Sequence, residues 1–130
     1  GNTLLSGTIR SNLLLGNPQA DEAHMKHALL MAQADFVYTL PQGLDTPCGE
    51  LGGGLSEGQA QRISIARTLL RDAPIYLFDE ATSALDNETE AKVIEQIVTC
   101  FPDRTLIFIT HRPRVLEYCT QQLHLKREES

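Results

Sequence analysis

The stretch that decides the fold is IYLFDE, residues 75–80, in which an apolar run leads directly into two carboxylates. A continuous apolar run of this length predicts a β-strand covered on both faces. The stretch TLIFIT, residues 105–110, has the same character. Between the two, Asp86-Asn87 is expected to begin a long helix with an apolar stripe at Ala91, Ile94, Ile97 and Val98. Strands that alternate with helices predict parallel pairing and an α/β architecture.

Upstream of these strands, the sequence predicts mainly helices. A short helix is expected over residues 8–15, ended by the turn residues Gly16-Asn17-Pro18. Residues 21–34 carry apolar side chains at helical spacing, and Asp21 and Glu22 suit the positive N-terminal end of a helix. The predicted apolar face of this helix consists of Met25, Ala28, Leu29 and Ala32.

A glycine-rich segment, residues 43–54, predicts an extended loop before a long helix. Ser56 and Gln59 fit a capping box, in which the two side chains satisfy backbone groups at the helix start. The buried stripe of this helix is expected to be Ile63, Ala66, Leu69 and Leu70. Downstream of the second strand, we expect a short helix from Pro113 and a final strand at 123–125. The sequence thus predicts a helical subdomain over residues 1–72 and part of a core sheet over residues 73–130.

Composition narrows the class of protein. The chain has 130 residues, 42% of them hydrophobic, and a net charge of −6. These values favour a folded domain and disfavour a nucleic-acid partner or charge-driven docking on an anionic membrane. No apolar run approaches the roughly 20 residues that span a bilayer, and no secretory signal is visible. Three scattered cysteines (Cys48, Cys100, Cys119) favour a reducing, cytosolic compartment.

Asp79 and Glu80 are the first candidate site, because ligands of open α/β sheets bind at the carboxyl ends of strands. One acid there can hold Mg²⁺ while its neighbour orients or deprotonates a water molecule. The alternative is that the two acids only mark the exit of the strand into solvent. His111 follows the second strand, so parallel pairing would place it beside these acids.

The second candidate is GGGLSEGQ, residues 52–59, a glycine-rich approach to a capped helix. Such a helix start offers free N–H groups and a partial positive charge to a phosphate, and Ser56 adds a hydroxyl. An ordinary capped helix after a loop is the alternative, although Gly58 costs helix stability and so favours a functional reason. None of the three lysines follows a glycine, so the phosphate-binding loop G-x-x-x-x-G-K-[ST] is absent from this sequence.

Taken in order, these motifs resemble the nucleotide-binding domain of ATP-binding-cassette (ABC) transporters, of the exporter type. Residues 55–59, LSEGQ, are similar to the signature motif LSGGQ, with Glu57 at its third position. Residues 75–80 resemble the Walker B strand with its catalytic glutamate, and residues 83–86, SALD, resemble the D-loop. His111 resembles the switch histidine. LLSGTIRSNL at 4–13 and TPCGELG at 46–52 resemble exporter segments, the latter with departures at Pro47, Cys48 and Leu51.

The resemblance implies a fold: a P-loop NTPase-like ABC ATPase fragment, with the helical subdomain and the C-terminal part of the mainly parallel, RecA-like core sheet. The Walker A loop, the adenine-stacking aromatic and the Q-loop glutamine of the family would precede Gly1. The isolated chain is therefore expected to be inactive. Because it would hold only part of the sheet, one edge or face of its apolar strands should be left uncovered, which predicts marginal stability, self-association or dependence on the absent half.

The resemblance also implies ATP and Mg²⁺ as ligands, with a role for each motif. Asp79 would position Mg²⁺, Glu80 would polarise the attacking water, and His111 would contact the γ-phosphate. The signature residues would contact ATP held by a second such domain in a head-to-tail dimer, and the D-loop would communicate across that dimer. The signature residues are Leu55, Ser56, Glu57, Gly58 and Gln59, and the D-loop residues are Ser83 and Asp86.

The implied partners are a second ABC ATPase domain and the transmembrane domains of an exporter, at the cytoplasmic face of the membrane, with no nucleic acid. Two other functions stay open on the sequence. One is a soluble ABC ATPase of DNA or translation function, which Gln59 and the acidic charge disfavour. The other is a truncated, non-catalytic docking module, which the complete set Asp79, Glu80 and His111 disfavours.

Overall fold

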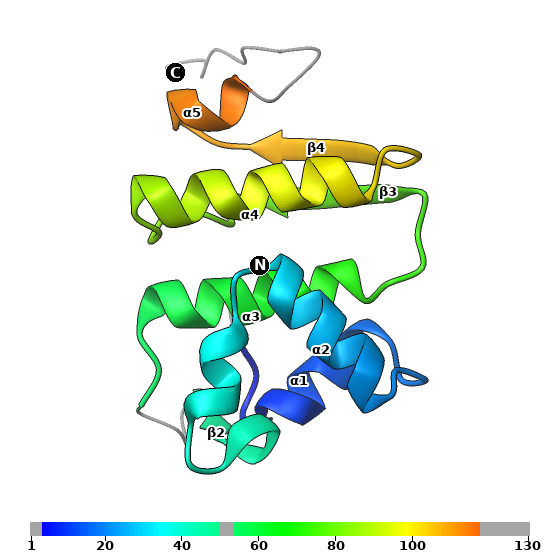
Figure 1. Cartoon of the computed structure of the whole chain (residues 1–130), viewed down its shortest axis with the longest axis vertical. Coiled ribbons are helices and arrows are strands. Elements are labelled where there is room, and N and C mark those ends of the chain that lie inside the picture. Colours follow the sequence, from blue (N-terminus) through cyan, green and yellow to red (C-terminus); the bar gives the residue numbers. More distant parts are fainter. Residues whose placement is uncertain (1–3, 50–53, 118–130) are drawn as a thin grey trace, which may run out of the picture.

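The computed structural model describes residues 4–49 and 54–117. Helices dominate the first part, in which two very short strands pair with each other (Figure 1). The elements of this part are β1 (Gly7–Thr8), α1 (Ile9–Gly16), α2 (Glu22–Met31), η1 (Asp35–Thr39), η2 (Gly43–Asp45), β2 (Pro47–Cys48) and α3 (Glu57–Leu69). Strands and helices then alternate in β3 (Ile75–Asp79), α4 (Asn87–Cys100), β4 (Thr105–Ile109) and α5 (Pro113–Leu116).

The helices α2, α3 and α4 start where the sequence predicts. The Ser56 and Gln59 side chains form the capping box of α3, and the Asp86 side chain caps α4. Asp21 caps α2 by accepting a hydrogen bond from the His24 N–H at 2.8 Å. Each of these bonds satisfies a backbone donor that the helix itself leaves unpaired, which is why a local sequence signal suffices to set the start.

The end of α2 differs from the prediction. The helix stops at Met31, three residues before Ala34, because Gln33 has a left-handed backbone with φ 57°. The Gln33 N–H donates to Leu30 O and the Ala34 N–H to Leu29 O, at 3.1 and 2.7 Å. This pair of bonds is a Schellman motif, which usually places glycine at the left-handed position. Because this position is glutamine and not glycine, the sequence carries no recognisable signal for the end of the helix here.

The extended loop predicted over residues 43–54 is wrong in its first half. Residues 43–45 form η2, and Pro47 and Cys48 form β2, which pairs antiparallel with β1 in the register Gly7↔Cys48 and Thr8↔Pro47. The Ile9 N–H also donates to Thr46 O at 3.0 Å. The start of α1 is thereby tied to this segment.

The parallel pairing of the two central strands is confirmed. β3 and β4 pair in register from Ile75↔Thr105 to Asp79↔Ile109. Among the described residues only one face of the pair is covered, as expected for part of a larger sheet, because Ile75 and Leu77 on the other face are 54% and 53% exposed. The covered face packs into the core through Tyr76 and Phe78. The strand predicted at 123–125 lies outside the described residues.

α4 lies across the β3–β4 pair in Figure 1 and buries one side of its surface against the core. Ile94 and Ile97 are buried as predicted, whereas Ala91 and Val98 are only partly buried. Val93 and Glu90 take the remaining buried positions. Among the described residues, no helix has the length and apolar character needed to cross a membrane. The described residues form two small sheets with helices packed on them, and the second part has the α/β architecture that the sequence predicts.

Candidate nucleotide-hydrolysis site

The acids predicted at the strand end lie where β3 leaves the sheet. Asp79 is the last residue of β3 and is exposed, and its partner in the parallel register is Ile109. Glu80 follows with a left-handed backbone, φ 53°, and its N–H donates to Ile109 O at 2.8 Å. A non-glycine residue in this conformation costs of order 1 kcal/mol, so the surrounding contacts must hold it there. The turn directs the chain away from the sheet directly after the acids.

The structure brings His111 to Glu80. His111 Nε2 lies 2.8 Å from Glu80 Oε1, although the two residues are far apart in sequence. The histidine side chain is 90% exposed, and the glutamate side chain is 31% exposed. This pair joins the carboxyl ends of two neighbouring parallel strands. An accessible carboxylate paired with an imidazole is suited to orienting and deprotonating a water molecule.

The start of α3 is an exposed, capped helix N-terminus. Ser56 Oγ accepts from the Gln59 N–H at 3.0 Å, and Gln59 Oε1 accepts from the Ser56 N–H at 3.0 Å. The Ser56 hydroxyl keeps its own hydrogen for donation to a ligand, because the cap uses the oxygen only as an acceptor. Ser56 and Glu57 are exposed, whereas Leu55, Gly58 and Gln59 are partly buried. The amide of Gln59 is committed to the cap.

Gly58 has a packing reason as well as the predicted functional one. A Cβ atom at this position would lie 3.1 Å from Ala84 O, which is tighter than ordinary van der Waals contact. The start of α3 therefore approaches the backbone of the turn after the acids very closely. Any larger residue would push these two segments apart.

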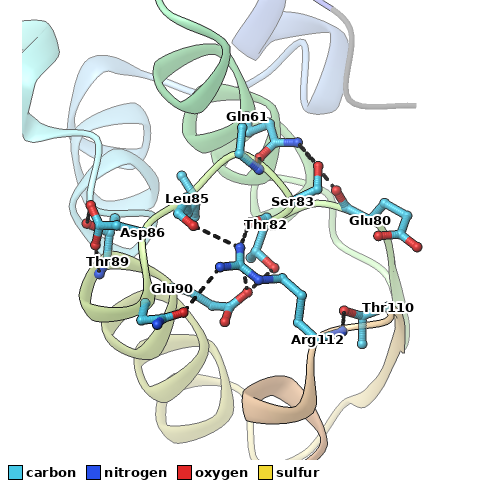
Figure 2. Close-up of polar contacts among 12 residues, drawn as sticks. Gln61, Glu80, Thr82, Ser83, Leu85, Asp86, Thr89, Glu90, Thr110 and Arg112 are labelled. Carbon is cyan, nitrogen blue, oxygen red and sulfur yellow. Dashed lines mark hydrogen bonds and ion pairs between the residues drawn. The ribbon is translucent and has the colours of Figure 1, made fainter.

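Gln61 links helix α3 to the turn that follows the two acids, and no sequence motif marked it. Its Nε2 donates to Ser83 Oγ at 2.7 Å, and its Oε1 accepts from the Ala84 N–H at 2.8 Å (Figure 2). Its Nε2 also lies 3.4 Å from Glu80 O. The side chain is 4% exposed, so these bonds are sheltered from water. A polar residue beside Ile65 on a buried helix face was the available signal.

Asp86 is held by the helix that it caps. Its Oδ1 accepts from the Thr89 N–H at 2.7 Å, and its Oδ2 accepts from the Thr89 hydroxyl at 3.0 Å. These bonds, led by the one from the backbone, lower the pKa of the Asp86 carboxyl below its ordinary value. Asp86 is thus ionised at neutral pH and exposed at the start of α4.

An ion pair with a fully buried carboxylate lies against the turn between β3 and α4, and no sequence motif marked it. Arg112 follows His111, and its guanidinium pairs with Glu90 of α4 at 3.1 Å. The Glu90 side chain has no exposed surface. Glutamate inside a predicted helix normally faces solvent, so only the spacing of Glu90 from Ile94 and Ile97, four and seven residues on, could have placed it on the buried face.

The donor set suits a hard cation at one position. Asp79 offers exposed carboxylate oxygens, and Mg²⁺ is commonly bound through one or two carboxylates with the rest of its shell from water and phosphate. Within residues 4–49 and 54–117, no group of three or more histidine, cysteine or acidic side chains could enclose a metal ion.

Comparison with known proteins gives one consistent result. Residues 3–83 match the family described as ABC transporter. A putative multidrug export ATP-binding/permease protein of Staphylococcus aureus is 48% identical over 85% of this chain and 19% of its own length. An ATP-dependent lipid A-core flippase of Xanthomonas oryzae pv. oryzae is 45% identical over 92% of this chain and 21% of its own length.

A solved structure agrees with these relatives. The structure of a bacterial Atm1-family ABC exporter with ATP bound superimposes with a TM-score of 0.80 at 43% identity, over 88% of this chain and 20% of that one. The chain thus spans about a fifth of the length of the relatives that it matches.

Proposed function

The chain belongs to the ABC transporter family, and we propose that it forms part of the ATP-binding and ATP-hydrolysing domain of an ABC exporter. The observation that carries this proposal is the contact between Glu80 and His111 at the carboxyl ends of two parallel strands. Hydrolysis of the terminal phosphoanhydride bond of ATP needs an oriented water and a group to accept its proton, and this pair is suited to orient the water and to accept the proton.

Glu80 acts on the attacking water in this proposal. Its partly exposed carboxylate accepts a proton from the water, and the His111 imidazole, within hydrogen-bonding distance, fixes the orientation of that carboxylate. His111 is itself exposed enough to contact the γ-phosphate of ATP. The left-handed backbone at Glu80 supports this arrangement, because it turns the side chain out of the strand direction toward β4.

Asp79 and the α3 start bind the ligands of the reaction. Asp79 holds Mg²⁺, which when bound neutralises charge on the phosphates. Ser56, Gly58 and the N-terminus of α3 present N–H groups and a hydroxyl to the γ-phosphate of ATP held by a second domain, with Leu55, Glu57 and Gln59 shaping that site.

The partners and the location follow from the same proposal. A second ABC ATPase domain binds head to tail, with Ser83 and Asp86 at the contact, and the transmembrane domains of the exporter bind on the cytoplasmic side of the membrane. Residues 1–72 act as the helical subdomain and residues 73–130 as part of the catalytic core. The isolated chain is expected to be inactive, since its sequence contains no phosphate-binding loop G-x-x-x-x-G-K-[ST] to hold ATP.

The two other functions raised by the sequence have less support. The relatives described above are named as an export protein, a flippase and an exporter, and none is named for DNA or translation. The net charge of −6 also disfavours contact with nucleic acid. A docking module without catalysis would have no need for the Glu80–His111 pair.

The test is ATP hydrolysis by the full-length protein in membrane vesicles. We expect turnover that requires Mg²⁺ and is insensitive to added DNA or ribosomes. Absence of hydrolysis would contradict the enzyme proposal and favour a docking module. Hydrolysis that DNA stimulates, by a protein recovered outside the membrane fraction, would favour the soluble ATPase.

A further inference from the structure

We propose that Arg112 is a positioning residue for hydrolysis: it ties the strand end that carries His111 to the turn that carries Ser83 and leads to Asp86. This inference rests on the proposed function. It concerns a residue that touches neither the water nor the phosphates in that proposal. Its effect on the reaction would pass through the two segments that it joins.

The guanidinium of Arg112 binds the turn at several points. Its Nη1 donates to Thr82 O and to Leu85 O, the latter at 2.8 Å, and its Nη2 lies 3.3 Å from Asn87 Oδ1 (Figure 2). Two of these acceptors are backbone carbonyls on either side of Ser83 and Ala84. One side chain therefore hydrogen-bonds the backbone at both ends of the turn. The planar, five-donor guanidinium is the only side chain that can hold such a spread of acceptors at once.

Glu90, on helix α4, holds the guanidinium in place. Its Oε2 lies 3.1 Å from Arg112 Nη1 and accepts from the Thr82 hydroxyl at 2.7 Å. Because this carboxylate is fully buried, losing its cation would leave an uncompensated charge in the interior. Since the Thr82 hydroxyl donates to the same carboxylate, the turn is attached to this ion pair.

Arg112 is also fixed on the side of His111. The Arg112 N–H donates to the Thr110 hydroxyl at 2.9 Å, which closes a small turn with His111 at its centre. His111 in turn lies against Glu80, whose own N–H is bound to β4. Because His111 and Arg112 are neighbours in the chain, displacing the guanidinium would change the position of His111 relative to the turn.

A misplacement of about 1 Å in a catalytic group can lower the rate about 100-fold without preventing folding. A lysine at 112 keeps the charge next to Glu90 but cannot reach Thr82 O, Leu85 O and Asn87 together. Arg112→Lys thus separates positioning from the buried ion pair. Arg104→Lys is a matched control, because the Arg104 side chain is 28% exposed and that of Arg112 is 26% exposed. Arg104 bonds Tyr76 Oη and Asp72, at the opposite ends of the same strands.

The experiment uses the full-length exporter in vesicles and compares the two lysine variants with the wild type. For Arg112→Lys we expect kcat for ATP hydrolysis to fall about 10- to 100-fold with KM for ATP within about threefold. For Arg104→Lys we expect both constants within about twofold of the wild type. A kcat for Arg112→Lys within twofold of the wild type, or an equal loss in both variants, would overturn the inference.

Amide hydrogen exchange of the same samples, without nucleotide, provides a readout that does not depend on hydrolysis. The Ser83, Ala84 and Leu85 N–H groups are hydrogen-bonded in the turn, so their exchange reports on its order. We expect faster exchange in peptides covering residues 80–87 for Arg112→Lys only. Unchanged exchange there would overturn the inference, even if the wild type fails to hydrolyse ATP and the proposed function falls separately.

Discussion

The two faces of the β3–β4 pair carry equally apolar side chains but have different surroundings. On the packed face, Phe78 stacks on Phe108 with ring centroids 5.1 Å apart, and Tyr76 meets Phe101 edge-on at 5.3 Å. The bare face consists of Ile75, Leu77, Ile107 and Ile109, each between 43% and 54% exposed. An apolar sheet face of this kind is normally covered by another layer. On the function proposed above, that layer is the rest of the nucleotide-binding domain.

The largest expected difference between the faces is in stability. Phe78→Ala should lower the free energy of unfolding of the 130-residue chain by about 3–5 kcal/mol, because it empties a buried, stacked position. Leu77→Ala should cost less than about 1 kcal/mol, since half of that side chain is already in water. Urea denaturation followed by circular dichroism measures both. Equal losses would show that the chain covers both faces by itself.

The second expected effect is on association. Leu77→Lys combined with Ile107→Lys should shift the isolated chain toward the monomer, because two charges replace the apolar surface through which copies would stick together. Sedimentation velocity over a range of concentrations measures this shift. Leu30→Lys is the control, since Leu30 is similarly exposed but lies on α2. If it disperses the chain as well, the bare face is not the contact.

The smallest expected effect concerns the cap of α4, the helix that lies over the packed face. The pKa of Asp86 is lowered in the folded chain by the bonds from Thr89, so its contribution to stability is present above the ordinary pKa of 3.8 and is lost as the pH falls through the folded value. Asp86→Asn keeps a capping oxygen without the titration.

We therefore expect wild type to lose more stability than Asp86→Asn between about pH 5 and pH 2.5. Thermal unfolding across this interval, followed through α4 helicity, measures the difference. Identical pH dependence in the two proteins would mean that the cap contributes nothing through its charge.

Local signals in the sequence predicted local features well. The Ser56 and Asp86 caps, the parallel pairing of 75–79 with 105–109 and the position of His111 beside Glu80 all follow from short motifs and from strand direction. The family match supports the same fold.

Features that depend on distant parts of the chain were missed. The β1–β2 pairing joins segments about 40 residues apart, and neither two-residue strand has a pattern of its own. Continuous apolar character predicted burial of both strand faces, but it does not say which segment of the protein covers each face. Gln61–Ser83, Glu90–Arg112 and Arg112–Thr82 are contacts between residues 22 to 30 positions apart. Local spacing could place Gln61 and Glu90 on a buried helix face, but it could not identify these partners.

The most direct measurement is the pair of constants, ATP affinity and single-turnover hydrolysis rate, for Glu80→Gln in the full-length protein. The control is Glu88→Gln, an exposed glutamate of α4 that pairs only with Lys92 among the described ion pairs. We expect Glu80→Gln to bind ATP within about threefold of the wild type and to hydrolyse it at least about 100-fold more slowly, with Glu88→Gln unchanged. A Glu80→Gln variant that hydrolyses ATP at the wild-type rate would contradict the assignment of this strand end as the catalytic site.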